Sequence, residues 1–382
     1  MAQFKRRLTY LLVLTAIIAA FVAGFSVRQA GSFIMRSPAP AASPVFIEDD
    51  QSYDDRMNLA LRDLVKKGSI FSPDDLSKSI NRAPVPTKLS INPRATAVDD
   101  GELYRRSLSA TLALYTNTVR GVNDMTGSQL GVAFVIEPSG LAVTCFHAIR
   151  FDEPFVMAAC TADGWKIEVK RVVGVFPRQD IALIQLEGDS FASLPLRLDA
   201  PAGTRVRVLG HPLSMHFFMT EGLLARYQML PAEGNKPPRP RMDLSLQATG
   251  GFSGGPVLDC SGNVIGVQDS MTTVRRGNES YTVVSAVPSN TLYSCISGDY
   301  HELLTDEEIK KLLLPRQPSQ TVSSCPMGKV VSDVEGTTIK LSVFDASGHL
   351  IYEGAPSDKF RARLPDWAKE PYDANLKAIT GN

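Results

Sequence analysis

Short apolar runs separated by turn-forming residues occupy the middle of the chain, from about Tyr104 to Ser297. They predict β-strands. The runs are Gly131–Ile136, Leu141–Cys145, Phe155–Ala159, Ile167–Val175, Ile181–Leu186, Arg205–Leu209, Leu244–Gln247, Val257, Val264–Gln268 and Tyr281–Val287. Many short strands at this spacing are typical of all-β domains, and the sequence offers few of the intervening helices that a parallel sheet needs. The pattern therefore predicts an all-β barrel or sandwich.

The flanking regions follow other periods. Apolar positions between Tyr53 and Ile70 predict a short helix, and Ser72-Pro-Asp-Asp has the chemistry to begin another. After the β region, Thr305-Asp-Glu-Glu308 is a capping box for a helix through Leu314. Alternation from Ile339 to Tyr352 around a central turn predicts a hairpin in a small carboxy-terminal β element.

The amino terminus has an uncharged run, Leu8–Phe25, directly after Lys5, Arg6 and Arg7. As a helix this run would rise about 27 Å, close to the hydrocarbon thickness of a bilayer. It favours an uncleaved membrane anchor with everything after Arg28 on the far side of the membrane, and a cleaved export signal is the alternative. Both interpretations export the rest of the chain.

Four parts follow from these patterns. We expect a signal anchor or signal peptide at 1–28, a linker with a short helical accessory segment at 29–100, a β domain at 101–298, and a helix with a small β element at 299–382. The 40 basic and 40 acidic side chains cancel, so no overall field attracts nucleic acid.

The five cysteines fit either one or two disulfides or reduced, buried thiols. No Cys-x-x-Cys or His-Glu-x-x-His pattern supports a metal site, and no cofactor is expected.

Ser253 is the candidate nucleophile. It lies in Thr249-Gly-Gly-Phe-Ser-Gly-Gly-Pro256, where small residues let the backbone turn sharply and expose the hydroxyl. Acyl transfer also needs donors for the oxyanion, and the N–H groups of Gly251 and Ser253 are placed to supply them. The string Gly-x-Ser-Gly-Gly-Pro is long enough to favour a catalytic loop over an ordinary one.

His147 and Asp180 are the candidate partners of Ser253. His147 ends the second strand of a predicted hairpin, and Asp180 immediately precedes a strand that should be buried. A base and an orienting carboxylate, in the chain order histidine, aspartate, serine, complete the set that activates a serine hydroxyl. The spacings are 33 residues from His147 to Asp180 and 73 from Asp180 to Ser253.

These segments resemble the trypsin-like serine peptidases and, more narrowly, the HtrA-like proteases of bacteria. The resemblance covers about residues 104–295 and includes Leu209-Gly-His-Pro212 and Val287-Pro-Ser-Asn290. It implies two six-stranded β-barrels with the catalytic triad at their junction and peptide-bond hydrolysis through an acyl-enzyme. Phe252 and Cys145-Phe146 depart from the family's usual residues, and residues 300–382 do not resemble a PDZ domain.

The specificity pocket follows from the same resemblance. Gln247 stands where enzymes that cut after Lys or Arg keep an aspartate, and an uncharged pocket base would not offset the desolvation of a cation. We therefore expect small or medium apolar P1 residues and a pocket formed by Gln247, Thr249, Ser285 and Ala286. The basic, Pro-rich stretch Gly234–Arg241 is expected to be a stiff exposed loop, or else to gate the cleft or dock a partner.

Three functional hypotheses follow. The first is an active serine endopeptidase acting on exported or envelope proteins, anchored in the inner membrane with its catalytic domain in the periplasm, or exported to the periplasm if the signal is cleaved. The second is a catalytically silent barrel that binds peptides or serves as a scaffold. The third is a structural envelope protein. The intact His147, Asp180 and Ser253 favour the first. The expected partners are a protein or peptide substrate and the membrane, and oligomerisation stays open.

Overall fold

A computed structural model of the chain describes most residues after position 45. The described residues are 46–80, 89, 91–121, 124–232, 237–276, 279–301, 304–313, 321–325, 327–335, 338–347 and 349–380. The apolar segment Leu8–Phe25 and the linker that follows it lie outside them. Within the described ranges, no helix is both long and apolar enough to span a bilayer.

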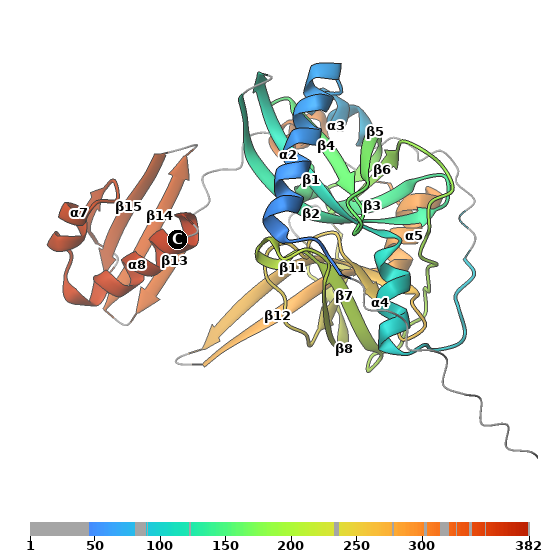
Figure 1. Cartoon of the computed structure of the whole chain (residues 1–382). Coiled ribbons are helices and arrows are strands. Elements are labelled where there is room, and N and C mark those ends of the chain that lie inside the picture. Colours follow the sequence, from blue (N-terminus) through green and yellow to red (C-terminus); the bar gives the residue numbers. More distant parts are fainter. Residues whose placement is uncertain are drawn as a thin grey trace, which may run out of the picture. The chain divides into compact units, whose positions relative to one another are not determined.

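Two closed, antiparallel six-stranded barrels form the centre of the described chain (Figure 1). The first has the strand order β1-β2-β3-β6-β5-β4 and the second the order β10-β11-β12-β9-β8-β7. The strands of the first barrel are β1 (Thr111–Gly121), β2 (Asp124–Glu137), β3 (Leu141–Cys145), β4 (Phe155–Cys160), β5 (Lys166–Phe176) and β6 (Ile181–Leu186). Those of the second are β7 (Arg205–Gly210), β8 (Phe218–Leu230), β9 (Arg239–Leu244), β10 (Pro256–Leu258), β11 (Val264–Arg276) and β12 (Glu279–Pro288). The expectation of a barrel or sandwich is thus resolved as two barrels.

The apolar pattern located most of these strands. The predictions Leu141–Cys145 and Ile181–Leu186 coincide with β3 and β6. The predicted strand Leu244–Gln247 is wrong, because β9 ends at Leu244 and the chain then turns toward Ser253. The apolar runs do not predict β1, β8 or most of β9. In β8, apolar and polar residues are mixed and most side chains are at least partly exposed, so period-two alternation is weak there.

Three groups of buried side chains make up the core of this region. One fills the first barrel, with residues such as Phe155 and Ile184, and another fills the second barrel, with residues such as Val206 and Val284. The third joins both barrels to the helix before them, and includes Met57 on that helix. Because β3 and β4 are buried on both faces, they are continuous apolar runs rather than alternating ones.

Five helices of the described chain flank the barrels. They are α2 (Asp50–Lys67), α3 (Pro73–Ser79), α4 (Asp100–Leu108), α5 (Ser289–Ser297) and α6 (Asp306–Leu313). The predicted helices near Tyr53, after Ser72 and after Thr305 are confirmed, the second with the Ser72–Asp75 capping box in place. Two short 3-10 helices, η1 (Phe146–Ala148) and η2 (Pro212–Ser214), lie within loops.

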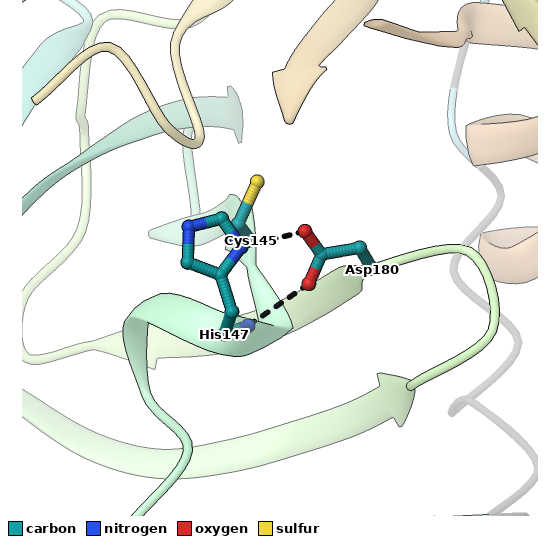
Figure 2. A group of neighbouring side chains, drawn as sticks. All are labelled: Cys145, His147 and Asp180. Carbon is teal, nitrogen blue, oxygen red and sulfur yellow. Dashed lines mark hydrogen bonds and ion pairs between the residues drawn. The ribbon is translucent and has the colours of Figure 1, made fainter. Parts of the chain in front are cut away.

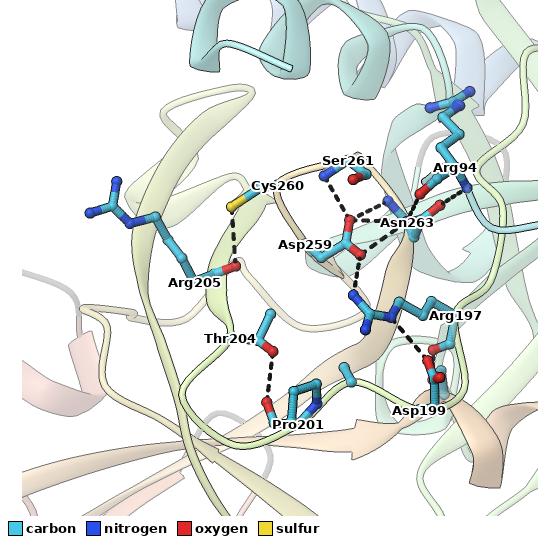
Figure 3. Close-up of polar contacts among 12 residues, drawn as sticks. Arg94, Arg197, Asp199, Pro201, Thr204, Arg205, Asp259, Cys260, Ser261 and Asn263 are labelled. Carbon is cyan, nitrogen blue, oxygen red and sulfur yellow. Dashed lines mark hydrogen bonds and ion pairs between the residues drawn. The ribbon is translucent and has the colours of Figure 1, made fainter. Parts of the chain in front are cut away.

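A buried polar turn ties the segment before α4 to the second barrel (Figure 3). Asp259 accepts hydrogen bonds from the N–H groups of Ser261 and Asn263 and from the Arg197 guanidinium. The Asn263 amide donates to the Arg94 carbonyl at 2.9 Å and accepts from the Arg94 N–H at 2.7 Å. Because Asp259 and Asn263 are both almost fully buried, this turn fixes the path of the chain into α4.

The carboxy-terminal residues form a separate sheet with its own core. Strands β13 (Thr321–Cys325), β14 (Gly328–Glu335), β15 (Thr338–Asp345) and β16 (Leu350–Gly354) pair in that order, followed by α7 (Asp358–Arg363) and α8 (Asp366–Thr380). Val330, Leu341 and Tyr372 are among its buried core residues. The predicted hairpin corresponds to β15 and β16, and it belongs to a larger sheet than the alternation alone indicated.

Candidate active site

His147 and Asp180 lie side by side at the end of the first barrel (Figure 2). Antiparallel pairing of β3 with β6 sets Cys145 opposite Ile181, so the residues just beyond these strand ends are neighbours. His147 Nδ1 is 2.6 Å from Asp180 Oδ2, and the His147 N–H donates to Asp180 Oδ1 at 2.9 Å. The structure therefore brings together two of the three residues that the sequence singled out.

The backbone at Asp180 is held in a left-handed conformation with φ of 59°. The Asp180 carbonyl accepts a hydrogen bond from the Phe146 N–H at 3.1 Å. Such a conformation is costly for a non-glycine residue and persists where surrounding contacts fix it. Since the carboxylate accepts at Nδ1, the other ring nitrogen, Nε2, is left as the basic one.

Ser253 lies on the loop between β9 and β10, which packs against the first barrel. The Ser253 carbonyl accepts from the Val132 N–H at 2.9 Å. A Cβ added at Gly131 would meet Ala148 Cβ at 3.2 Å and the Ser253 carbonyl oxygen at 3.5 Å. Ala148 follows His147 directly, so the Ser253 carbonyl and the side chain next to His147 lie against the same glycine. Among the hydrogen bonds of the described residues, none joins the Ser253 hydroxyl to His147.

The oxyanion loop, defined here as Gly250–Gly254, turns through positive φ at Gly251 (100°) and Gly254 (86°). The Gly251 carbonyl accepts from the His211 N–H at 2.8 Å, and the Gly254 N–H donates to Gln268 at 2.8 Å. No described hydrogen bond uses the N–H of Gly251 or Ser253 as a donor. Both groups predicted to bind an oxyanion thus remain uncommitted.

Phe252 points into the second barrel. Its side chain is only 2% exposed and belongs to that barrel's core, and it packs so closely on Gly210 that a Cβ there would lie 2.4 Å from the ring. The Phe252 ring therefore holds the oxyanion loop against the core of the second barrel.

A cavity of about 730 Å³ opens beside His147 and Asp180. Of the residues predicted to form the substrate pocket, Ser285 lines this cavity. Gln247 and Thr249 are exposed and are not among its lining residues, while Ala286 is fully buried in the second barrel. The cavity wall is rich in charge and includes Arg226, Arg239, Arg241, Asp243 and Asp269.

A buried ion pair that the sequence analysis did not identify lies within the second barrel, between strands β9 and β11. Arg241 Nε lies 3.1 Å from Asp269 Oδ2, and both side chains are at most 5% exposed. Arg241 also donates to the side chain of Gln179 at 3.2 Å and to its carbonyl at 3.3 Å. Burial raises the pKa of Asp269 and lowers the pKa of Arg241. The nearby charge of Asp180 raises the pKa of Asp269 further. The expectation of an exposed loop through Arg241 is therefore wrong for this residue, although alternating polar positions in Arg239–Asp243 fit strand β9.

Cys145, His147 and Asp180 each offer a ligand atom within 4.8 Å of the others (Figure 2). The Cys145 thiol donates to the Gln268 carbonyl, and Nδ1 and the carboxylate are bonded to each other. Burial raises the pKa of Cys145 well above its ordinary value, which disfavours the thiolate that a metal ion would need. These groups are thus engaged in the hydrogen-bond network of the site, and we assign no metal to them.

Cys145, Cys160 and Cys260 are free thiols, which agrees with the expectation of reduced cysteines rather than disulfides.

Comparison with known proteins gives consistent results. Residues 131–267 match the family of trypsin-like peptidase domains. The chain is 29% identical over 200 residues to "Uncharacterized protein y4bJ" of Sinorhizobium fredii, which covers 50% of this chain and 29% of that protein. It is 29% identical over 157 residues to a "Probable periplasmic serine endoprotease DegP-like" of Pseudomonas fluorescens, covering 40% of this chain and 32% of the relative. A protein of the same name from Pseudomonas putida is 24% identical over 174 residues, covering 45% and 35%.

The matched region therefore spans about a third of the length of these relatives. The family match, residues 131–267, contains strands β3 to β10 together with His147, Asp180 and Ser253. The two-barrel fold and these similarities identify residues 131–267 as a trypsin-like peptidase domain, similar to that of DegP-like proteases of the HtrA type.

Proposed function

We propose that this protein is a serine endopeptidase that hydrolyses peptide bonds through an acyl-enzyme. The observation that carries the proposal is the 2.6 Å contact between His147 Nδ1 and Asp180 Oδ2, made beside the loop that carries Ser253. Asp180 holds the imidazole in the tautomer with a basic Nε2, and His147 takes the proton of the Ser253 hydroxyl.

In the first half of the reaction, the Ser253 oxygen attacks the peptide carbonyl and the N–H groups of Gly251 and Ser253 stabilise the resulting oxyanion. The C–N bond breaks when His147 returns the proton to the leaving amine. In the second half, His147 takes a proton from water, the hydroxide attacks the acyl-enzyme, and the proton returns to Ser253. The uncommitted N–H groups of the oxyanion loop support this assignment.

The substrates we propose are exported or envelope proteins. The apolar segment Leu8–Phe25 would place the peptidase domain beyond the inner membrane, as an anchor or as a cleaved signal, and two relatives are named as periplasmic endoproteases. This proposal includes a division of the chain into four parts: residues 1–28 for export, 29–100 as a linker and accessory segment, 101–298 for catalysis and 299–382 as a carboxy-terminal element. The preference for small or medium apolar P1 residues rests on Gln247.

Digestion of a reduced, unfolded protein by the full-length chain tests this function, with Ser253→Ala as the matched control. We expect new termini after small or medium apolar residues, identified by mass spectrometry, with the wild type only. Cleavage mainly after Arg or Lys would contradict the P1 assignment. Equal absence of cleavage with both proteins would favour the catalytically silent module, an alternative supported by the lack of a described hydrogen bond between Ser253 and His147.

A further inference from the structure

Helix α2 is bonded to a buried histidine of the second barrel. The His216 side chain is fully buried, and both its backbone N–H and its Nδ1 lie within hydrogen-bond distance of Asp50 Oδ1, at 2.8 and 2.9 Å. Its other nitrogen, Nε2, contacts the Tyr115 hydroxyl and lies 3.3 Å from Asp54 Oδ1. Side chains from two successive turns of α2 thus contact one imidazole ring. Apolar packing of a helix would not require these directed polar contacts.

His216 belongs to the His211–Phe217 loop, which follows β7 and contains η2. Three of its residues, Leu213, Ser214 and Phe217, have positive φ between 52° and 61°. Non-glycine residues hold such angles only where the surroundings over-determine them. The contacts that do so include the Phe217 N–H to His211 Nδ1 at 3.1 Å and the Tyr104 hydroxyl to the Phe217 carbonyl at 2.9 Å.

The same loop contacts the oxyanion loop at its other end. The His211 N–H donates to the Gly251 carbonyl, and a Cβ added at Gly251 would lie 2.2 Å from the His211 carbonyl oxygen. The backbone of Gly251 therefore has no room to shift toward His211. A continuous series of contacts runs from Asp50 through His216, Phe217 and His211 to Gly251.

We propose that α2 positions the oxyanion hole, with Asp50 and Asp54 acting through His216 and the His211–Phe217 loop. This inference rests on the proposed peptidase function and adds a role for the segment before the barrels. When α2 is docked, the His211–Phe217 loop holds the backbone of Gly251 in place. When the contacts to His216 are lost, the strained His211–Phe217 loop relaxes. Gly251 then loses its contact with His211, and the oxyanion is bound less tightly. Asp50 and Asp54 are positioning residues that do not touch the substrate.

The test is Asp50→Asn in the full-length protein. We expect kcat for a peptide substrate to fall at least tenfold with KM nearly unchanged, because the oxyanion forms only in the transition state. The affinity for a peptidyl trifluoromethyl ketone, which forms a tetrahedral adduct, should fall by the same factor, while a non-reactive peptide of that sequence binds as before. Asp55→Asn is the matched control on the exposed face of the same helix and should leave all three quantities unchanged.

Two outcomes would overturn the inference. One is an active wild type with the same kcat and adduct affinity in Asp50→Asn. The other is a variant that is less stable to heat but keeps full turnover per folded molecule, which would assign α2 a structural role only. If Asp50→Asn does not fold, Tyr115→Phe provides the same test, because the Tyr115 hydroxyl contacts both His216 and Asp54. An inactive wild type would instead contradict the peptidase function itself.

Discussion

The two barrels hold their parts of the site in different ways. In the first barrel, His147 and Asp180 lie at the ends of paired strands and bond directly to each other. In the second, Ser253 lies on a glycine-rich loop that is fixed by its neighbours: Phe252 in the core behind it, Val132 across the barrel junction and His211 beside it. The first half is determined by strand register, whereas the second depends on packing from several elements.

The largest effect should come from the first barrel. Asp180→Asn leaves an amide that can hold His147 in the wrong tautomer, so kcat should fall by about 10⁴-fold with little change in folding. Steady-state kinetics with circular dichroism checks this. The exposed Asp189, which follows β6, provides the control Asp189→Asn, which should be fully active. Unchanged turnover in Asp180→Asn would remove Asp180 from the site.

The next effect tests how Phe252 anchors the loop. Phe252→Ala removes a ring that is 2% exposed, and truncation of a buried phenylalanine costs about 3–5 kcal/mol in the free energy of unfolding. Urea denaturation measures this loss. Phe218→Ala, at a residue that is 48% exposed, should cost far less. Similar small losses in both variants would mean that the loop does not depend on the core behind it.

Gly251→Ala tests the backbone of the oxyanion loop. The new methyl group would require φ of 100° in an alanine and would lie 2.2 Å from the His211 carbonyl oxygen, so the loop must move. Loss of one oxyanion donor lowers kcat by about 10²–10³-fold. Gly250→Ala is the matched control, since no atom lies within 4 Å of its added Cβ. Equal activity of the two variants in a peptide assay would contradict the role of Gly251.

The smallest effect at neutral pH concerns His211. Burial, and secondarily the nearby His216, lowers its pKa from 6.5 to about 3. Between these values the unfolded chain binds more protons than the native protein, so His211 favours folding above pH 6.5 and this contribution is lost as the pH falls. The free energy of unfolding should decline by about 1.4 kcal/mol per pH unit in this window. His211→Asn should flatten that slope in urea titrations; an unchanged slope would show that His211 is not responsible.

The sequence predicted what depends on local pattern. Strands β3 and β6 and the contact between His147 and Asp180 could be predicted because apolar runs and short motifs mark them. The Arg241–Asp269 pair could not, since an arginine in a Pro-rich stretch is usually exposed and only the barrel junction buries it. The Asp50–His216 contact joins residues 166 positions apart, and no local pattern encodes such a pairing. The direction of the Phe252 side chain could not be predicted either, because it depends on the core of the second barrel, into which the ring packs.

Labelling of the full-length protein with a fluorophosphonate probe tests the central claim most directly, because only an activated serine reacts at neutral pH. The account predicts a single adduct on Ser253, located by peptide mass spectrometry and lost in Ser253→Ala and after denaturation. No adduct on the folded wild-type protein, or an undiminished adduct in Ser253→Ala, would contradict it.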